Sequence, residues 1–388
     1  MAKYKLGDIC EIVSGCTPKT GIDEYWNGDI KWITPAELSD ESYVISDSVR
    51  KITDLAVKKT GMTSLPVGTV LLSSRAPIGK VAIAGCEMYC NQGFKNLICS
   101  DNINNRYLYW FLKGNTAFLN SLGRGATFKE ISKSIVSEIE INVPDIQEQE
   151  EAVANLEKIN KVIALRKREL VLLEDLISAR FVEMFGDPVQ NTKGWNIDTC
   201  KNLTSKIGSG ATPKGGRESY GTEGISLIRS MNVYNNRFEY KDLAYITDEQ
   251  ADKLSNVTIE ENDVLLNITG ASVARCCAVP KELIPARVNQ HVAIVRCKDR
   301  LLPEFLCSMF TEDSYQRLLW SIATSGGATR EAITKQQIED LVLIVPPIEL
   351  QQQFVDFCKQ VNKLKVEVQK SLDETQTLFD SLMQKYFG

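Results

Sequence analysis

Two long, proline-free segments that each end in Phe-Gly most restrict the fold of this 388-residue chain. The first follows Pro144 and runs to Gly186, and the second follows Pro346-Pro347 and runs to Gly388. Apolar residues recur in steps of three and four, or sums of these, which is typical of a coiled-coil seam. The first seam holds Leu156, Ile159, Ile163, Leu170, Leu173, Ile177 and Met184; the second holds Cys358, Val361, Leu372, Phe379 and Tyr386, with Lys365 and Thr375 as polar exceptions.

These segments predict two long helices, residues 146–188 and residues 348–388. Proline is tolerated just before a helix, and glycine is common where a helix ends. At 1.5 Å per residue, about 40 residues span roughly 60 Å. A helix with one apolar stripe must cover that stripe. The simplest cover is the other copy, packed as an antiparallel coiled coil; the alternative is two independent helices on the surfaces of two domains.

The regions before the two helices also repeat. Residues 1–145, here called head 1, and residues 189–347, here called head 2, carry the same short motifs in the same order. Insertions and deletions lie mostly between these motifs, where loops belong. The chain is therefore predicted to run head, helix, head, helix. The matched pieces are Ser14–Lys19 with Ser209–Lys214, Ile30–Thr34 with Ile225–Arg229, Val70–Leu72 with Val264–Leu266, Asn91–Gln92 with Asn289–Gln290, and Gly125–Thr127 with Gly327–Thr329.

Each head has the pattern of a mixed α and β domain, so the predicted fold class is α+β: two repeated α/β domains joined by two long helices that form an antiparallel coiled coil. Short β-branched or apolar runs bounded by Gly, Pro or Asn indicate strands, but their order in a sheet does not follow from the sequence. The predicted strands are 70–73, 80–84, 97–99, 139–143, 264–268, 274–279, 291–297 and 341–345, and the predicted short helices are 106–112, 303–309 and 314–322.

The overall charge argues against a chain that grips DNA unaided. The net charge is −5, from 45 basic and 50 acidic residues, and head 1 holds equal numbers of each. A free-standing DNA binder is usually basic, whereas a protein that reads bases beside a phosphate-binding partner need not be. No apolar run is long enough for a membrane span. The first ten residues, MAKYKLGDIC, lack an apolar signal core, so we do not expect export. The 11 cysteines form no C-x-x-C pair, so we expect reduced thiols in a cytoplasmic protein.

The residues that most catalytic sites need are scarce. The one histidine, His291, lies in an apolar strand pattern and is interpreted as a core or edge residue. Neither a G-x-x-x-x-G-K-[ST] phosphate loop nor a G-x-G-x-x-G motif occurs. The acidic group 145–151 begins the first long helix, where carboxylates favour the helix dipole, so a metal-dependent nuclease receives little weight. We therefore expect neither catalysis nor a metal or cofactor site in this chain.

The remaining candidates are loops rich in donors for nucleic acid. Arg can contact guanine and Asn or Gln adenine through paired hydrogen bonds, while Ser, Thr and Lys hold phosphates. The alternative is that these side chains satisfy the backbone of their own turns. The five tryptophans, 26, 32, 110, 195 and 320, are expected in the core. The candidate DNA-binding residues are Thr17, Lys19, Thr34, Arg75, Lys80, Asn91, Gln92, Arg124 and Thr127 in head 1, and Thr212, Lys214, Arg229, Arg275, Asn289, Gln290, Thr329 and Arg330 in head 2.

Taken together, these motifs resemble the specificity subunits of type I restriction–modification systems over nearly the whole chain. The motifs are S-G-x-T-P-K at 14–19 and 209–214, L-L-S-S-R-A-P-I-G-K at 71–80, N-Q-G-F at 91–94, G-A-T followed by I-[ST]-K at 125–133 and 327–335, and the V-P-D-I-Q-E-Q-E and V-P-P-I-E-L-Q-Q-Q starts of the long helices. Head 2 departs from this pattern with N-I-T-G-A-S and N-Q-H-V, which fits heads that read different sequences.

The resemblance implies that each head is a target-recognition domain and that the helices are spacers. It implies a non-catalytic subunit that binds double-stranded DNA at two short half-sites separated by unspecified bases. It also implies two methyltransferase subunits, which use S-adenosylmethionine, and optional restriction subunits with ATP and Mg²⁺; no membrane is involved. Half-sites about 34 Å apart suit a rigid spacer better than a flexible linker. The alternatives are a coiled-coil adaptor that joins protein partners without DNA readout, and an enzyme in its own right.

Overall fold

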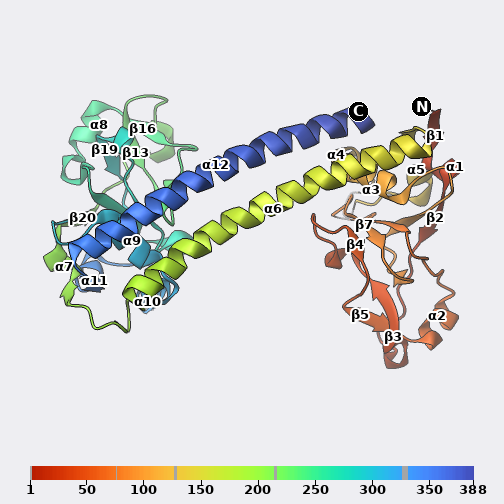
Figure 1. The fold of residues 1–388 in the computed structure, drawn as a ribbon, viewed down its shortest axis with the longest axis horizontal. Coiled ribbons are helices and arrows are strands. Elements are labelled where there is room, and N and C mark those ends of the chain that lie inside the picture. Colours follow the sequence, from red (N-terminus) through yellow and green to blue (C-terminus); the bar gives the residue numbers. More distant parts are fainter. Residues whose placement is uncertain (1, 76, 126–128, 214–215, 326–330) are drawn as a thin grey trace. The chain divides into compact units, whose positions relative to one another are not determined.

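The computed structural model describes residues 2–75, 77–125, 129–213, 216–325 and 331–388 (Figure 1). The chain divides into two compact units: unit 1 is Met1–Lys167 with Lys370–Gly388, and unit 2 is Arg168–Gln369. Each unit thus contains one head, part of the first long helix and part of the second. None of the helices in the described ranges combines the length and the apolar character that crossing a bilayer requires.

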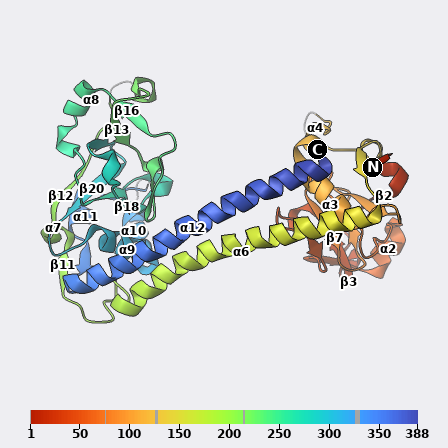
Figure 2. The ribbon, with the colours of Figure 1, turned by 45° about the horizontal axis from the view of Figure 1, so that its top comes forward.

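The two predicted long helices are confirmed. Helix α6 is Ile146–Phe185 and helix α12 is Ile348–Phe387, each of 40 residues and each continuous in the ribbon (Figures 1 and 2). Gly186 follows α6 with a φ of 75°, a conformation that favours glycine and stops the helix. The sequence therefore predicted both the existence and the approximate ends of these helices.

A buried glutamine ties the start of each long helix to its own head. The side chain of Gln149 donates to the carbonyls of Pro144 (2.9 Å) and Asn102 (3.1 Å), and it accepts from the backbone N–H of Asn104 (2.8 Å). Gln351 makes the matching set, to the carbonyls of Pro346 (2.9 Å) and Arg300 (3.0 Å) and from the N–H of Leu302 (3.0 Å). Backbone groups that are buried at the start of a helix need hydrogen-bond partners. At each junction the glutamine side chain provides the hydrogen bonds that water would otherwise make.

Head 1 is built on a five-stranded sheet of order β2-β9-β6-β7-β4 and a three-stranded sheet of order β5-β3-β8, with β1 paired to β10. The β3–β8 and β4–β7 pairs are parallel and the others are antiparallel. The elements are β1 Ala2–Lys5, α1 Leu6–Ile9, β2 Cys10–Ser14, η1 Asp23–Tyr25, β3 Trp26–Ile33, η2 Pro35–Glu37, β4 Val44–Ile45, β5 Arg50–Ile52, α2 Asp54–Thr60, β6 Val70–Leu72, β7 Val81–Ala84, β8 Tyr89–Cys90, β9 Lys95–Cys99, α3 Asn105–Gly114, α4 Thr116–Ser121, α5 Lys133–Ser137 and β10 Glu140–Val143.

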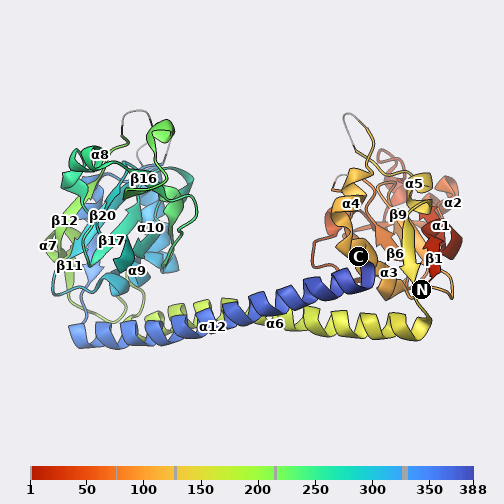
Figure 3. The same cartoon turned by 90° about the horizontal axis from the view of Figure 1, so that it is seen from above.

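Head 2 repeats this topology. The sheet β12-β20-β17-β18 matches β2-β9-β6-β7, the sheet β16-β13-β19 matches β5-β3-β8, and β11 pairs with β21 as β1 does with β10. Strands β12, β20 and β17 of head 2 are labelled in Figure 3. Head 2 also has a β14–β15 hairpin, for which the described residues of head 1 show no matching strand pair. The elements are β11 Ile197–Thr199, α7 Cys200–Leu203, β12 Thr204–Ser209, η3 Gly216–Ser219, β13 Ile225–Ile228, η4 Ser230–Asn232, β14 Val233–Tyr234, β15 Arg237–Phe238, β16 Ala244–Ile246, α8 Asp248–Asp252, η5 Ser255–Val257, β17 Asp263–Asn267, η6 Gly270–Ser272, β18 Cys276–Ala278, η7 Lys281–Leu283, β19 Ala286–Val288, β20 Val292–Cys297, α9 Pro303–Thr311, α10 Asp313–Thr324, α11 Lys335–Glu339 and β21 Val342–Ile344.

The core of unit 1 combines residues of head 1 with residues from the start of α6 and the end of α12. Helix α3 contributes Tyr107 and Trp110, and α6 contributes Leu156. The C-terminal part of α12 closes over them: the rings of Trp110 and Phe379 lie 5.6 Å apart, and those of Tyr107 and Phe387 lie 4.9 Å apart. The first head-domain core is therefore completed by residues from the far end of the sequence.

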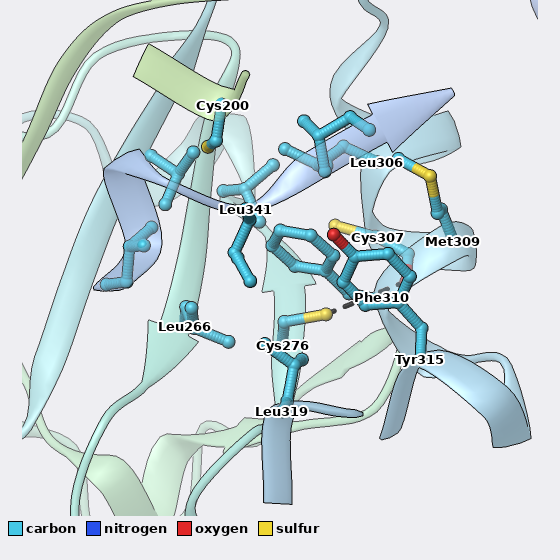
Figure 4. Packing of buried hydrophobic residues seen from close by; sticks show 14 of the residues in the cluster. Cys200, Leu266, Cys276, Leu306, Cys307, Met309, Phe310, Tyr315, Leu319 and Leu341 are labelled. Atoms are coloured by element: carbon cyan, nitrogen blue, oxygen red, sulfur yellow. Dashed lines mark hydrogen bonds between the residues drawn. The ribbon is translucent and has the colours of Figure 1, made fainter. Parts of the chain in front are cut away.

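The core of unit 2 is larger and also draws on both helices. Phe181 of α6 stacks on Phe305 at 5.6 Å and meets Phe354 of α12 edge-on at 5.5 Å. Deeper in this core, the Cys276 thiol donates to the Cys307 carbonyl over 3.6 Å (Figure 4). All 11 cysteines are free thiols, as the sequence predicted.

Within each unit the helix parts pair in opposite directions. In unit 1, Asn155 of α6 donates to the Tyr386 hydroxyl of α12 over 3.1 Å. In unit 2, Lys365, one of the polar exceptions in the predicted seam, pairs with Glu174 at 3.0 Å. A polar seam position is thus matched by a charge on the facing helix.

One core prediction is wrong. Trp26, Trp32 and Trp110 are buried and Trp195 is half-buried, but Trp320 is 44% exposed. Helix α10 is amphipathic, and the residues that it buries recur at Tyr315, Leu319 and Ala323. Trp320 is one position out of that register, which turns its side chain away from the core.

Candidate nucleic-acid interface

In head 1, the loop after β2 packs directly on the loop before β9. The fit at Gly15 excludes a side chain, because a Cβ there would lie 1.9 Å from the Asn91 carbonyl oxygen. The next residue, Cys16, donates its N–H to the Cys90 carbonyl over 2.9 Å. Beyond it, the Thr17 hydroxyl donates to the side-chain oxygen of Gln92. Two predicted segments, 75 residues apart in sequence, therefore form one surface.

The loop after β6 joins the same surface. The N–H of Ser74 donates to the Gly93 carbonyl over 2.7 Å, and the Ser74 carbonyl accepts from the N–H of Ile131 over 2.9 Å. Arg124 and Glu130 exchange both backbone hydrogen bonds, at 3.0 and 2.9 Å, so these two residues form an antiparallel bridge. The four motif-bearing segments of head 1 thus meet, as a shared binding surface requires.

A three-residue charge cluster lies where these loops meet. The Arg75 Nε donates to one oxygen of Glu130 over 2.9 Å, and the Lys95 ammonium donates to the other over 3.1 Å. Lys95 also contacts the Ser74 hydroxyl at 3.4 Å and is buried. Partial burial raises the pKa of Glu130, but the hydrogen bonds from Lys95 and Arg75 outweigh it, and the pKa is lowered. Glu130 is therefore a carboxylate at neutral pH.

Two other candidates in head 1 have structural partners. The Thr34 hydroxyl donates to the Glu37 carboxylate over 3.1 Å in a capping box at η2. The Lys80 ammonium donates to the Leu38 carbonyl. Both side chains therefore stabilise their local fold.

The remaining described candidates of head 1 divide in the same way. The side-chain oxygen of Asn91 accepts from the N–H of Gly93 over 2.9 Å. Asn91 therefore bonds to the backbone of its own turn, which is the alternative that the sequence left open. Lys19, Gln92 and Arg124 are exposed. These three side chains can reach a ligand on the surface where the loops meet or at its edge.

Head 2 brings the same segments together with different side chains. A Cβ at Gly210 would lie 1.7 Å from the Val288 carbonyl oxygen, and the Gly210 N–H donates to the Asn289 carbonyl over 3.1 Å. The Thr212 hydroxyl donates to the side-chain oxygen of Gln290, as Thr17 does to Gln92. Asn289 is buried, and its side-chain oxygen accepts from the N–H of His291 over 3.0 Å.

His291 links two of the loops in head 2. Its Nδ1 lies 2.6 Å from the Thr269 hydroxyl, and its Nε2 lies 3.2 Å from the Gln290 side-chain nitrogen. Because Gln290 accepts from Thr212 through its oxygen, its nitrogen donates to Nε2, and Nδ1–H then donates to Thr269. The sequence assigned His291 to the core or to a sheet edge; the structure places it half-buried at the edge, in a hydrogen-bonded chain of four polar side chains.

Two of the predicted arginines in head 2 have other neighbours. The Arg229 guanidinium donates to the Asp242 carbonyl and lies 5.4 Å from the Tyr220 ring centroid. The Arg275 guanidinium lies 4.7 Å from the Tyr234 ring centroid. Both cations are therefore held against aromatic rings of their own head. Four candidates lie outside the described residues: Thr127, Lys214, Thr329 and Arg330.

The candidate residues predicted from the sequence omit three polar residues of these surfaces: Lys95, Glu130 and Thr269, of which Thr269 lies in the N-I-T-G-A-S segment of head 2 that the sequence did mark. Glu130 lies 55 residues from Arg75 and 35 from Lys95, so no local motif marks the cluster. The arrangement offers guanidinium, amide and hydroxyl groups suited to bases and phosphates. Within the described ranges, no three His, Cys, Asp or Glu side chains are grouped to hold a metal ion.

Comparison with known proteins yields a consistent family. A family model described as "Type I restriction modification DNA specificity domain" matches residues 1–175 and again residues 193–375, once for each head with most of its helix. The MjaIX type I restriction enzyme specificity subunit of Methanocaldococcus jannaschii is 28% identical over 409 aligned positions, covering 98% of this chain and 91% of the relative.

Solved structures share the fold. The S subunit of a type I restriction–modification system from M. genitalium aligns with a TM-score of 0.61 at 13% identity, over 100% of this chain and 96% of its own. A chain from a structural study of complex assembly and conformational transition in a type I system aligns with a TM-score of 0.63 at 18% identity, over 99% and 97%. The two-head, two-helix plan is therefore common to these proteins.

Proposed function

We propose, from the premise that this chain belongs to the family of type I restriction–modification DNA specificity subunits, that its heads bind the two half-sites of one bipartite DNA target. One observation carries the proposal. Each head brings the same motif-bearing loops together through matching contacts: close backbone packing at Gly15 and Gly210, and side-chain hydrogen bonds in the Thr17–Gln92 and Thr212–Gln290 pairs. A constant scaffold with different side chains suits two readers of different sequences.

The second part of the proposal concerns partners. The net charge of −5 is unusual for a protein that holds duplex DNA alone. We propose that two methyltransferase subunits supply most of the phosphate contacts, and that restriction subunits can join them in the cytoplasm. S-adenosylmethionine, ATP and Mg²⁺ then belong to those partners, and this chain is non-catalytic. The absence of a phosphate-loop motif from the sequence supports this division of labour.

The third part concerns the long helices. We propose that α6 and α12 form an antiparallel coiled coil that acts as a spacer between residues 1–145 and residues 189–347. Support comes from the contacts inside each unit, Asn155–Tyr386 in one and Glu174–Lys365 in the other. A stiff spacer would fix the number of bases between the half-sites.

The spacer has a direct test. Adding four residues to each helix lengthens it by about 6 Å, roughly two base pairs of DNA. In cells that carry the lengthened chain, methylome sequencing is expected to show both half-sites unchanged and the gap longer by about two base pairs. A control chain has four exposed residues of each helix replaced by alanine, with no change in length. An unchanged gap in the lengthened chain would contradict the spacer role.

The acidic balance also favours a second candidate, a coiled-coil adaptor that joins protein partners without reading DNA. The two functions differ in one measurement. A complex of the full chain with its methyltransferase subunits should bind a duplex that carries the methylated site more tightly than a scrambled duplex. Equal binding of both duplexes, with the complex intact, would favour the adaptor.

A further inference from the structure

We infer that Glu130 is a positioning residue for DNA readout by head 1: anchored by the buried Lys95, it orients Arg75 to contact the edge of a guanine. The inference rests on the proposed function of the heads and adds to it a base and a residue pair. It also assigns a role to two side chains that no motif marks.

The first observation is how Arg75 is held. Its Nε donates to Glu130 over 2.9 Å, and its side chain is 46% exposed. Bonding through Nε leaves the fork of Nη1 and Nη2, with which no other side chain in the described part of the chain forms an ion pair or hydrogen bond. That fork matches the two acceptors of guanine, O6 and N7, in the major groove.

The second observation is what holds Glu130. Its other oxygen accepts from Lys95 over 3.1 Å, and Lys95 is 6% exposed on β9. Lys95 also contacts the Ser74 hydroxyl at 3.4 Å. A line of polar contacts therefore runs from the sheet through Lys95 and Glu130 to Arg75. Holding a long side chain before binding reduces the entropy lost on binding.

The third observation is that the loop architecture does not require these charges. The bridge between Arg75 and Glu130 has a counterpart between Thr269 and Ala332 in head 2. The bond from the Ile131 N–H to Ser74 also recurs there, from the Ile333 N–H to Ile268 at 2.8 Å.

Lys95 has its counterpart too. It faces Ser14 across the β2–β9 pair, and the residue that faces Ser209 in the matching pair is Ala293. The same backbone frame therefore forms in head 2 with threonine and two alanines. The cluster of head 1 is not needed to build the frame, which points to a role in recognition.

The test uses the full chain in complex with its methyltransferase subunits. Binding is measured for the methylated site and for duplexes in which one base pair of the head 1 half-site is changed at a time. The variants are Arg75→Lys, which keeps the charge but loses the fork, and Glu130→Gln. Glu138→Gln is the matched control, because Glu138 forms an exposed ion pair with Lys5 at 2.6 Å.

Arg75→Lys is expected to abolish discrimination at a single G·C pair and to weaken binding of the intact site by about 5- to 150-fold, the range for one paired contact. Glu130→Gln is expected to reduce discrimination at that same base pair by a smaller factor, roughly 3- to 10-fold. Glu138→Gln should match the wild type. Readout of the head 2 half-site should be unchanged in all variants.

Glu130→Gln removes the charge partner of a buried lysine, so thermal unfolding is measured in parallel. Glu130→Asp keeps that charge but shortens the arm by one methylene, and it should reduce discrimination at the same pair. The inference is overturned if Arg75→Lys weakens all duplexes equally, as a phosphate contact would, or if both folded Glu130 variants discriminate as the wild type does. Site-specific binding by the wild type in that case leaves the proposed function standing.

Discussion

Replacing Gln149 by leucine should destabilise unit 1, although leucine is of similar size and is a residue that normally favours burial. The amide of Gln149 is fully buried. It satisfies the carbonyls of Pro144 and Asn102 and the N–H of Asn104, at 2.9, 3.1 and 2.8 Å. Leucine can make none of these bonds, and the closed junction leaves the three backbone groups without water.

The expected loss follows from the number of groups left unpaired. A buried polar group without a partner costs about 1–3 kcal/mol. Three such groups at the lower limit cost about 3 kcal/mol, and the added apolar burial of leucine returns about 1 kcal/mol. The free energy of unfolding should therefore fall by about 2 kcal/mol or more. With a urea slope of about 1–3 kcal/mol per molar, the midpoint should shift by roughly 1 M.

The assay is urea unfolding of the full chain, followed by the fluorescence of Trp110 in unit 1 with the other four tryptophans replaced by phenylalanine. The control is Gln147→Leu, two residues earlier on the same helix, where the side chain is exposed. An exposed change of this kind should stay within about 0.5 kcal/mol of the parent. If Gln149→Leu and Gln147→Leu give the same midpoint, the amide does not hold the junction and the reasoning is wrong.

Two further predictions concern unit 2. Burial raises the pKa of Glu312 to about 7, although a hydrogen bond from the Ser178 hydroxyl opposes the shift. In an unfolded chain the pKa of a glutamate is roughly 4.3, so between these values the folded state binds one more proton than the unfolded state. The free energy of unfolding should therefore fall as the pH rises from about 4.5 through 7. Urea midpoints at pH 5 and pH 8 should show this fall in the parent and a smaller one in Glu312→Gln, and equal slopes would contradict it. His291→Ala breaks the link between Thr269 and Gln290 and should weaken binding of the site by about 10-fold, one hydrogen-bonded contact, with altered discrimination only in the head 2 half-site; a change confined to the head 1 half-site would count against it.

The long helices could be predicted because their information is local and repeated. In the first helix, apolar steps of three and four, or sums of these, persist from Leu156 to Met184, and Gln149 and Gln351 occupy the same place in each copy. The loops that meet in each head could also be predicted, since Thr17 and Gln92 each sit in a repeated motif. Because the same surface occurs in both heads, its motifs appear twice in the sequence and can be recognised by comparing the two halves.

The parts that differ between the copies could not be predicted. In head 1, Lys95 meets Glu130, and in head 2, His291 meets Thr269. Both pairs form only through the tertiary fold, which joins segments far apart in sequence, such as β2 and β9. Trp320 shows a second limit: its helix was predicted, but the one-position offset that exposes it depends on which face meets the core. Composition alone favours burial of tryptophan.

The division of unit 1 into Met1–Lys167 and Lys370–Gly388 affects the order in which the molecule can mature during translation. The ring contacts of Trp110 with Phe379 and of Tyr107 with Phe387 can form only after the ribosome has synthesised all of unit 2. Head 1 is therefore synthesised first, but the core of its unit is completed after the core of unit 2. During that interval an apolar face of α3 remains open, so a pause in elongation between residues 186 and 370 would leave the nascent chain most prone to aggregation or to chaperone capture.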